Sequence, residues 1–444
     1  MLIPSLGVLG GLAGLRYMSA QTVRSFLRRI MTDPYPENLA ELYTATKRTG
    51  IQEIIETNLR AEFGRLIQRP FGSPKKYRHF DALMFGPAIV DRLALPSATP
   101  IDTAVVIGPR AKQPLKIDIP LLIAGMAYKR ALSAEMKYAL ALGSTKAGTA
   151  TNTGEGPILP KERQLAERLI VQYPRLPLHR SLAILEKADA IEIQLGQGAT
   201  VGGAQADEPQ TVETDLPRYD HPKDLPRLVR FLRDAGGGVP VGVKFPMTDK
   251  IEEHIKFCLR AGVDFLVLDG AQGATYGAPP ILADDFGLPT FVGLCRATHY
   301  LANHNRTGRV SLIVSGGFTS PGQCLKAIAL GADAVALGTM ALYAASHTQT
   351  LKAIPWEPPT QVAFARSKYA KQFNWKKGAE TLNRYLQSCT EEIKEGVRAL
   401  GKHSLQEVSR RDLVALDEVT SQIAQVPLAY SKTKTRAGSP SWEK

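Results

Sequence analysis

Two glycine-containing segments of this sequence have the composition of phosphate-binding loops. Ser-Gly-Gly-Phe-Thr-Ser (315–320) ends one apolar run, and Leu-Gly-Thr-Met (337–340) ends the next. Glycine lets backbone N–H groups approach an anion, and a helix starting near Pro321 would add the positive end of its dipole. The same glycines could simply permit tight turns, but two such loops on adjacent strands favour a phosphate site. Its expected members are Ser315, Gly316, Gly317, Gly338 and Thr339.

Lys244 narrows the choice of phosphorylated ligand. It stands near the end of the apolar run 239–245, where burying a cation is costly without an anionic partner. FMN, a sugar phosphate and PRPP all carry a suitable phosphate. A lysine beside N1 and O2 of a flavin stabilises the reduced, anionic ring, and this favours FMN. Alternatively, Lys244 extends into solvent from a rim or pairs with Glu192 or Asp269.

The elements that must position these residues alternate between short apolar strands and helices. Eight apolar runs are expected as strands: 120–127, 144–148, 169–174, 190–196, 239–245, 264–270, 310–317 and 334–339. Nearly continuous apolar strands are typical of parallel sheets covered by helices on the outside. Eight such units predict an α/β fold, a closed (β/α)8 TIM barrel whose site lies at the carboxyl ends of the strands. A doubly wound open sheet is the alternative.

The segments before and after the alternating strands and helices define the expected domain organisation. Residues 1–95 are predicted to be a helical leader with a hydrophobic N-terminus, and 96–345 the barrel. Residues 346–430 show helical spacing and are expected to pack on the barrel as an extension. Residues 431–444 are polar and are expected to form a flexible tail.

The composition restricts the class of protein. Hydrophobic residues make up 44% and charged residues 22%, as in ordinary globular proteins. The net charge of +13 comes from scattered lysines and arginines without a dense basic run, so we expect no nucleic-acid partner. Four cysteines far apart in sequence predict no metal site and a reducing, cytoplasmic compartment.

The N-terminus is apolar but short. Residues 2–15 are followed by Arg16, Arg24, Arg28 and Arg29. The apolar run is shorter than the roughly 20 residues of a spanning helix. We expect a helix that packs on the domain or on a partner, with weak membrane association through residues 2–18 as the alternative.

Several further motifs occur in an order that resembles a known family. They are Asn-Thr-Gly-Glu-Gly (152–156), Gln-Gly-Ala (197–199) with Gly202 and Gly203 behind it, Gly-Ala-Thr-Tyr-Gly-Ala-Pro (273–279), and Met126 at the end of the first strand. Over roughly residues 80–345 the sequence resembles the FMN-binding domain of glutamate synthases.

The resemblance implies roles for individual residues. The flavin ring would rest on Met126 and Ala127, with Asn152 and Gln194 or Gln197 at its polar edge and Lys244 facing N1 and O2. Gly273 would also contact the cofactor, and the glycine loops would hold its phosphate. The substrate would lie near Glu155, Gln205 and Gln272.

Glu155 and Lys244 are the expected catalytic residues. Glu155 is the candidate acid–base group, because a low-dielectric pocket beside a flavin favours the protonated carboxyl. Alternatively, Glu155 caps the following helix or pairs with Lys146 or Lys161.

The sequence also departs from the family pattern. The family places substrate-binding lysines at the positions of Gln194 and Thr200, and Arg130 or Arg296 could replace their charge. Segment 341–347 lacks the cysteines of the family's iron–sulfur cluster, and we expect no N-terminal glutaminase domain. Electrons would therefore come from a soluble donor or a donor protein.

The expected activity is that of an FMN-dependent oxidoreductase of the glutamate synthase type, acting on CH–NH2 donors. Hydride would pass between the flavin and an imine or amino-acid-like small molecule. The alternatives are a 2-hydroxy-acid oxidase or isomerase-like FMN barrel and a non-catalytic flavin-carrying module. Hydroxy-acid oxidases need a histidine base at a strand end, whereas His254 and His299 lie in helical stretches.

Overall fold

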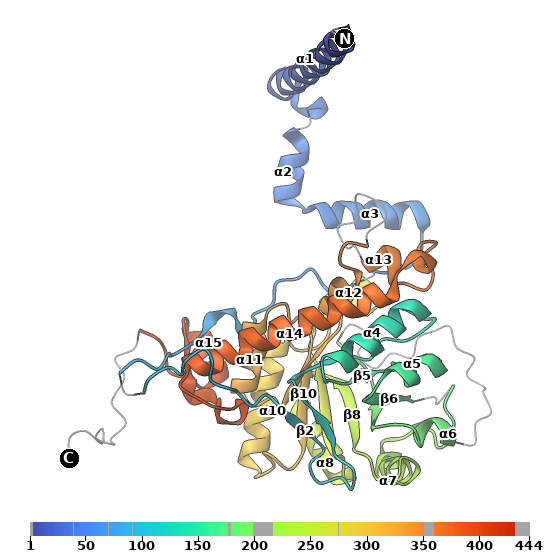
Figure 1. The fold of residues 1–444 in the computed structure, drawn as a ribbon, viewed down its shortest axis with the longest axis vertical. Helices are drawn as coiled ribbons and strands as arrows, with labels where there is room; N and C mark the ends of the chain where they lie inside the picture. The colour runs from blue at the N-terminus through green and yellow to red at the C-terminus, as the bar shows by residue number, and fades with distance from the viewer. Residues whose placement is uncertain are drawn as a thin grey trace. The chain divides into compact units, whose positions relative to one another are not determined.

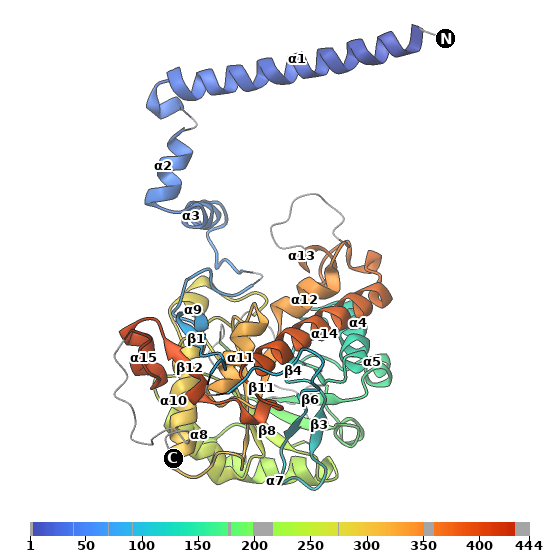
Figure 2. The same ribbon diagram turned by 60° about the vertical axis from the view of Figure 1, so that its left-hand side comes forward.

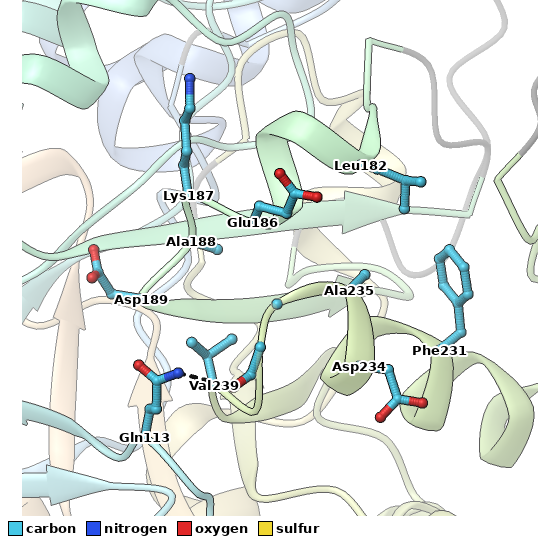
Figure 3. A pocket seen from close by; sticks show the side chains of 12 residues that line it. Gln113, Leu182, Glu186, Lys187, Ala188, Asp189, Phe231, Asp234, Ala235 and Val239 are labelled. Carbon is cyan, nitrogen blue, oxygen red and sulfur yellow. Dashed lines mark hydrogen bonds between the residues drawn. The ribbon is translucent and has the colours of Figure 1, made fainter.

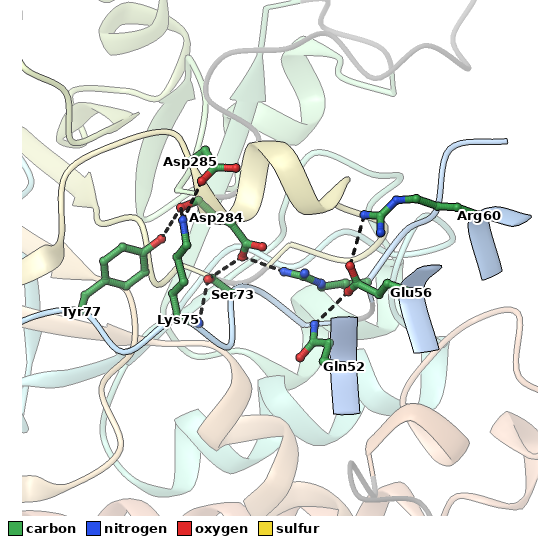
Figure 4. A network of polar contacts seen from close by, with 9 residues as sticks. Gln52, Glu56, Arg60, Ser73, Lys75, Tyr77, Asp284 and Asp285 are labelled. Atoms are coloured by element: carbon green, nitrogen blue, oxygen red, sulfur yellow. Dashed lines mark hydrogen bonds and ion pairs between the residues drawn. The ribbon is translucent and has the colours of Figure 1, made fainter. Parts of the chain in front are cut away.

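The computed structural model describes residues 3–38, 40–69, 71–90, 92–175, 179–198, 216–273, 275–349 and 359–430. The chain divides into two compact units, Met1–Ile67 and Gln68–Lys444. The first unit contains α1 (Ile3–Thr32), a 3-10 turn (Tyr35–Glu37), α2 (Ala40–Arg48) and α3 (Ile51–Phe63). On α3, Glu56 accepts hydrogen bonds from Gln52 at 2.9 Å and Arg60 at 3.3 Å (Figure 4).

The second unit is built on a barrel of eight parallel strands (Figures 1 and 2). In chain order they are β4 (Leu121–Ile123), β5 (Thr151–Asn152), β6 (Leu169–Pro174), β7 (Ala190–Gln194), β8 (Val241–Pro246), β9 (Phe265–Asp269), β10 (Ser311–Ser315) and β11 (Ala334–Leu337). The order around the sheet is β4-β11-β10-β9-β8-β7-β6-β5. The Ile123 N–H donates to the Ala150 carbonyl at 3.0 Å and joins the two ends of the sheet. The TIM-barrel prediction is confirmed.

Helices surround the strands. They are α4 (Ala134–Lys146), α5 (Pro160–Leu165), α6 (Leu182–Leu185), α7 (Leu225–Ala235), α8 (Ile251–Ala261), α9 (Pro280–Asp284), α10 (Thr290–Asn303), α11 (Pro321–Ala329) and α12 (Thr339–Ser346), with a 3-10 turn (Pro222–Asp224) before α7.

The strand predicted at 144–148 is wrong. Ser133 caps α4 by accepting from the Met136 N–H at 3.2 Å, and α4 continues to Lys146. The second strand is the two-residue β5, Thr151–Asn152. The helix is buried on several faces. One of them packs Gly143 against Leu382 of the C-terminal helix α14 (Trp375–Ala399), so the sequence of α4 lacks a clear apolar stripe.

The amino end of the barrel is closed by a hairpin of β2 (Val105–Ile107) and β3 (Leu115–Ile117). Its apolar side chains join barrel-interior residues such as Ile170, Val267 and Ile313 in one buried cluster. Beside this end, a surface cavity of ≈ 640 Å³ lies between the start of β7 and the end of α7 (Figure 3). The side chain of Gln113 donates to the Gly237 carbonyl there at 2.9 Å. The carboxyl ends of the strands are at the opposite side.

C-terminal segments pack along the barrel. They comprise α13 (Pro359–Val362), α14 (Trp375–Ala399), β12 (Leu413–Ala415), α15 (Glu418–Ala424) and short 3-10 turns at Ala370–Gln372, Leu405–Glu407 and Arg410–Asp412. The long α14 lies against α4, α11 and α12 (Figure 2). β12 pairs with β1 (Leu83–Phe85), which follows a 3-10 turn at Phe80–Ala82. The predicted tail, 431–444, lies outside the described residues.

The segment before β1 is fixed to the loop after β9. Asp284 accepts hydrogen bonds from Arg69 at 2.7 Å and Ser73 at 2.6 Å, and its carbonyl accepts from Tyr77 at 2.8 Å. Lys75 pairs with Asp285 at 2.6 Å (Figure 4). These contacts carry the chain toward the carboxyl ends of the strands, where residues 79–80 pack on the β10 loop.

Candidate functional site

Six consecutive strands each place a buried polar side chain near their carboxyl ends. We call this set the polar belt: Asn152, Gln172, Glu192, Lys244, Asp269 and Ser315, each no more than 5% exposed. Burying polar and charged side chains is unfavourable unless they form hydrogen bonds or ion pairs with one another or with a ligand. The belt therefore marks the carboxyl end of the barrel as a site for chemistry.

The belt is linked by hydrogen bonds and charge. The Gln172 amide donates to Glu192 at 2.6 Å, and the Ser315 hydroxyl donates to Asp269. Burial raises the pKa of Glu192, and Lys244 is the largest influence that lowers it. Lys244 Nζ lies 3.7 Å from Asp269 Oδ2, which is one of the two pairings expected from the sequence. That separation is too long for a strong hydrogen bond, so the contact between the two groups is one of charge.

A lysine that the sequence interpretation missed fixes the strand tips next to the belt. Lys137 of α4 is fully buried, and its Nζ donates to the carbonyls of Met126, Asn152 and Thr153 at 2.9–3.1 Å. It also pairs with the fully buried Glu162 at 2.9 Å. Lysines on helices are usually exposed, and no sequence signal distinguished this one.

Arg180 holds the loop after β5 in the same way. Its guanidinium donates to the carbonyls of Gly154 at 2.8 Å and Gly156 at 2.9 Å, and to that of Gln172 at 2.7 Å. Burial lowers the pKa of Arg180 to about 10. A Cβ on Gly154, whose φ is +68°, would lie 2.5 Å from the Ala127 nitrogen. The 152–156 loop thus lies directly on the backbone of Met126 and Ala127, and this brings four predicted site residues together: Met126, Ala127, Asn152 and Glu155.

Glu155 pairs with Arg130 at 3.1 Å, and both side chains are about one-quarter exposed. The lysines considered as partners lie elsewhere: Lys146 pairs with Glu380, and Lys161 lies over the Tyr138 and Trp375 rings. Of the two arginines that could replace the family lysines, Arg130 is the one that contacts Glu155 in the 152–156 loop. Arg296 pairs with Glu252 on the outer helices at 2.6 Å.

The loops after β7 and β9 also meet near the belt. Gln194 donates to Gln197 at 3.4 Å, and the Gly198 N–H donates to Asp269 at 3.1 Å. A Cβ on Gly273 would lie 2.6 Å from Asp269 Oδ1. Gln194, Gln197, Lys244 and Gly273 are therefore grouped around Asp269. Gln205 and Thr200 lie outside the described residues.

The two glycine loops lie at the ends of neighbouring strands, since Ser315 pairs with Ala336 in the sheet. Gly316 and Gly317 adopt φ angles of +113° and +75°, and the Thr290 hydroxyl donates to the Gly316 carbonyl at 2.8 Å. Gly338 caps α12, and among the described residues nothing beyond its immediate chain neighbours lies within 4 Å of the position that its Cβ would occupy. The predicted phosphate residues are thus adjacent, with open space at Gly338.

The donor set suits the flavin expected from the resemblance. Two buried amide atoms, Gln194 Oε1 and Gln272 Nε2, have no hydrogen-bond partner within the described part of the chain. A flavin ring offers both donors and acceptors to such groups, and its phosphate matches the glycine loops. In the described ranges, no group of three or more His, Cys, Asp or Glu side chains is placed to hold a metal ion, and the four cysteines are free and buried.

A (β/α)8 barrel with adjacent glycine loops and a buried polar belt at its carboxyl end is the architecture of cofactor-binding barrel proteins. Within this class, the chain matches the model of the conserved region in glutamate synthase over residues 73–216 and 210–403. It belongs to that family.

Individual relatives agree with this assignment. The chain is 32% identical over 406 residues to a glutamate synthase large subunit-like protein of Rhizobium meliloti (strain 1021), covering 81% of this chain and 90% of the relative. It is 32% identical over 316 residues to an archaeal-type glutamate synthase [NADPH] of Thermotoga neapolitana. That match covers 66% of this chain and 61% of the relative. Solved structures of similar fold include a mandelate oxidase mutant with the monooxide FMN adduct, at 18% identity and TM-score 0.50 over 75% of this chain and 88% of that one. Another is a mutant flavocytochrome b2 with benzoylformate, at 16% identity and a TM-score of 0.51. The match covers 76% of this chain and 77% of that one.

Proposed function

We propose that this protein binds FMN at the carboxyl end of its barrel and is an oxidoreductase of the glutamate synthase type. The observation that carries the proposal is the buried Lys244, set in the polar belt that leads from the 152–156 loop to the glycine loop after β10. Membership of the glutamate synthase family supports the same conclusion. The proposed substrate is a small imine or amino-acid-like molecule, with CH–NH2 as the donor group.

Each part of the site has a proposed task. Gly316, Gly317, Gly338 and Thr339 would hold the phosphate with Ser315 beside them, and the backbone of Met126 and Ala127 would support the ring. Asn152, Gln194, Gln197 and Gly273 would contact its edge. When bound, FMN supplies the chemistry of accepting or donating hydride.

The chain's own charges would do the remaining work. Lys244 would place positive charge beside the polar edge of the ring. Glu155 would exchange a proton with substrate, and its ion pair with Arg130 would hold it in place. Arg130 would also offer a cation to a substrate carboxylate in place of the family's lysines. Gln205 and Gln272 are proposed as further substrate contacts, and a soluble donor or donor protein as the source of electrons.

The alternative of a 2-hydroxy-acid oxidase gains no specific support. His254 lies on α8 beside Thr248, and His299 lies on α10, where it contacts Arg410. Neither histidine is at the end of a barrel strand. The oxidases found among similar structures are alike in fold.

An absorbance spectrum of the purified protein, with mass analysis of the released cofactor, tests the proposal. We expect flavin bands and the mass of FMN. Photoreduction followed by a screen of imine and amino-acid acceptors then separates an enzyme from a flavin-carrying module. A colourless protein that takes up no FMN would refute the proposal.

Replacing Gly338 with alanine is expected to weaken FMN binding about tenfold or more while leaving the unfolding midpoint nearly unchanged. The new methyl group meets no protein atom within 4 Å, so it would occupy space proposed for the phosphate. Loss of a charge-assisted hydrogen bond has an effect of this size. Flavin fluorescence titration and thermal unfolding measure the two quantities. Gly86→Ala, at an exposed glycine after β1 whose added methyl also meets nothing within 4 Å, is the control, and equal FMN affinity in both variants would contradict the prediction.

We also propose weak association of the N-terminal unit with anionic membranes, in a cytoplasmic location that suits the free cysteines. No helix in the described ranges combines the length and apolarity needed to cross a bilayer. On α1, however, Val23, Phe26, Leu27 and Met31 share one face and are 48–84% exposed. Arg28 and Arg29 lie toward the opposite side, Arg24 borders the apolar face beside Met31, and residues 1–32 contain no acidic residue. Such a helix lies in the plane of a membrane interface.

Binding to vesicles that contain phosphatidylglycerol is expected to exceed binding to phosphatidylcholine vesicles. The double variant Phe26→Ser/Leu27→Ser should lower it at least about tenfold, because two apolar side chains lose their burial. Co-sedimentation of the full chain measures binding, with Gln21→Ser on the polar face as control. Unchanged binding of the double variant would exclude this surface. A change in oligomeric state without vesicle binding would indicate packing on a partner instead.

A further inference from the structure

We infer that His79 supplies a side-chain hydrogen-bond donor to the phosphate site at Gly316 and Gly317. The inference rests on the proposed FMN function and names a residue that comes from outside the barrel strands. His79 directly precedes the 3-10 turn Phe80–Ala82. Its Nε2 lies 3.6 Å from the position that a Cβ on Gly317 would occupy.

Aromatic packing fixes the orientation of the His79 ring. The ring meets Phe80 edge-on at 4.6 Å between centroids and Phe318, in the glycine loop itself, at 5.8 Å. Phe80 in turn stacks on Phe318 at 5.3 Å. These aromatic neighbours therefore hold the imidazole against the glycine loop. They fix the plane of the ring and with it the positions of the two ring nitrogens.

Both ring nitrogens of His79 are buried, and neither completes a hydrogen bond of good geometry within the described part of the chain. The Gly316 backbone is the neighbour that acts on the ring as a hydrogen-bonding group, and it belongs to the same loop. Burying polar atoms without partners is unfavourable, so an acceptor bound at this loop would satisfy them.

A second unused donor flanks the same glycine. Gln272 Cβ lies 2.7 Å from the Gly317 Cβ position. Its Oε1 accepts from the Thr290 N–H at 2.8 Å, which leaves its buried Nε2 without a partner among the described residues. Two side chains with unsatisfied nitrogens thus contact the position of one left-handed glycine, which suits an anion site, whereas a glycine needed only for a turn requires neither.

The charges around His79 suit a neutral donor. Burial is the main cause that lowers its pKa, and Lys326 of α11 lowers it further. Asp81 and the Gly316 backbone oppose this change. Lys326 is itself engaged with the Phe80 carbonyl at 3.1 Å. A neutral imidazole still has one N–H to donate.

Comparing FMN with riboflavin isolates the phosphate contact, because riboflavin lacks only that group. His79→Phe keeps an aromatic ring for packing and removes both nitrogens. We expect the Kd for FMN to rise about 10- to 100-fold, the range for a hydrogen bond to a charged group, with the Kd for riboflavin changed by no more than about twofold. His79→Gln, which returns an N–H near the position of Nε2, should recover part of the FMN affinity.

Titrations by flavin fluorescence use the full chain, with unfolding midpoints measured for every variant. His304→Gln, at an exposed histidine at the end of α10, is the control and should bind both flavins like the parent chain. Equal losses for FMN and riboflavin would assign His79 a purely structural role, and unchanged FMN affinity would remove it from the site. A parent chain that binds neither flavin would refute the FMN proposal itself.

Discussion

Replacing Lys137 with methionine is expected to lower the free energy of unfolding of the barrel by about 3–5 kcal/mol, the range for removing one partner of a buried ion pair. The change would leave the fully buried Glu162 without its cation and would release three backbone carbonyls at Met126, Asn152 and Thr153. Urea unfolding followed by circular dichroism measures the loss. Because those carbonyls form the proposed floor of the flavin site, FMN affinity should fall as well.

The effect of Lys137→Met should depend on pH. Burial raises the pKa of Glu162, and Lys137 is the largest influence that opposes this rise. Without the lysine, the folded-state pKa of Glu162 rises further above its unfolded value. A carboxyl group with a raised folded pKa favours the folded state at low pH and loses that contribution as pH increases. The variant should therefore be less impaired at pH values of about 5 than at about 8.

Two variants provide the controls. Lys146→Met, on the same helix, breaks the exposed pair with Glu380 and should cost no more than about 1 kcal/mol. The double variant Lys137→Met/Glu162→Gln should lose less than the sum of its single changes, because no uncompensated charge remains. Equal losses for Lys137→Met and Lys146→Met would show that the buried lysine is not a structural requirement.

Replacing Lys244 with methionine is expected to slow hydride transfer by about 10²- to 10³-fold, as does removal of a group that stabilises developing charge in other enzymes. Its ammonium group is the cation of the polar belt and lies 3.7 Å from Asp269 Oδ2. Stopped-flow reduction of the bound flavin measures the rate. The midpoint potential should become more negative, because the reduced, anionic ring loses its counter-charge.

Lys244→Arg retains the charge and should recover part of the rate and potential. Lys187→Met, beside the cavity at the other end of the barrel, should alter neither quantity (Figure 3). FMN affinity must be measured alongside, since Glu192 and Asp269 remain buried in the methionine variant. A normal rate and potential in FMN-loaded Lys244→Met protein would exclude the proposed role.

Strand positions were largely predictable because a parallel barrel buries its strands in continuous apolar runs. The exception, 144–148, lies in α4, where burial on several sides removes the helical stripe that would have marked it. The glycine loops were predictable for a related reason: consecutive strand ends in a barrel must meet at one rim. Lys244 was predictable because a cation is unusual within an apolar run.

By itself, the sequence determined the barrel, the rim that bears the site and the family that it resembles, since each depends on local pattern or motif order. Only the tertiary structure decided which groups meet there. Lys137, Arg180 and His79 come from a helix, a loop and the segment before the barrel, and Glu155 pairs with Arg130 instead of either expected lysine. Contacts between distant segments depend on how helices and loops pack over the strands. The residue types and their spacing along the chain therefore do not predict the individual contacts.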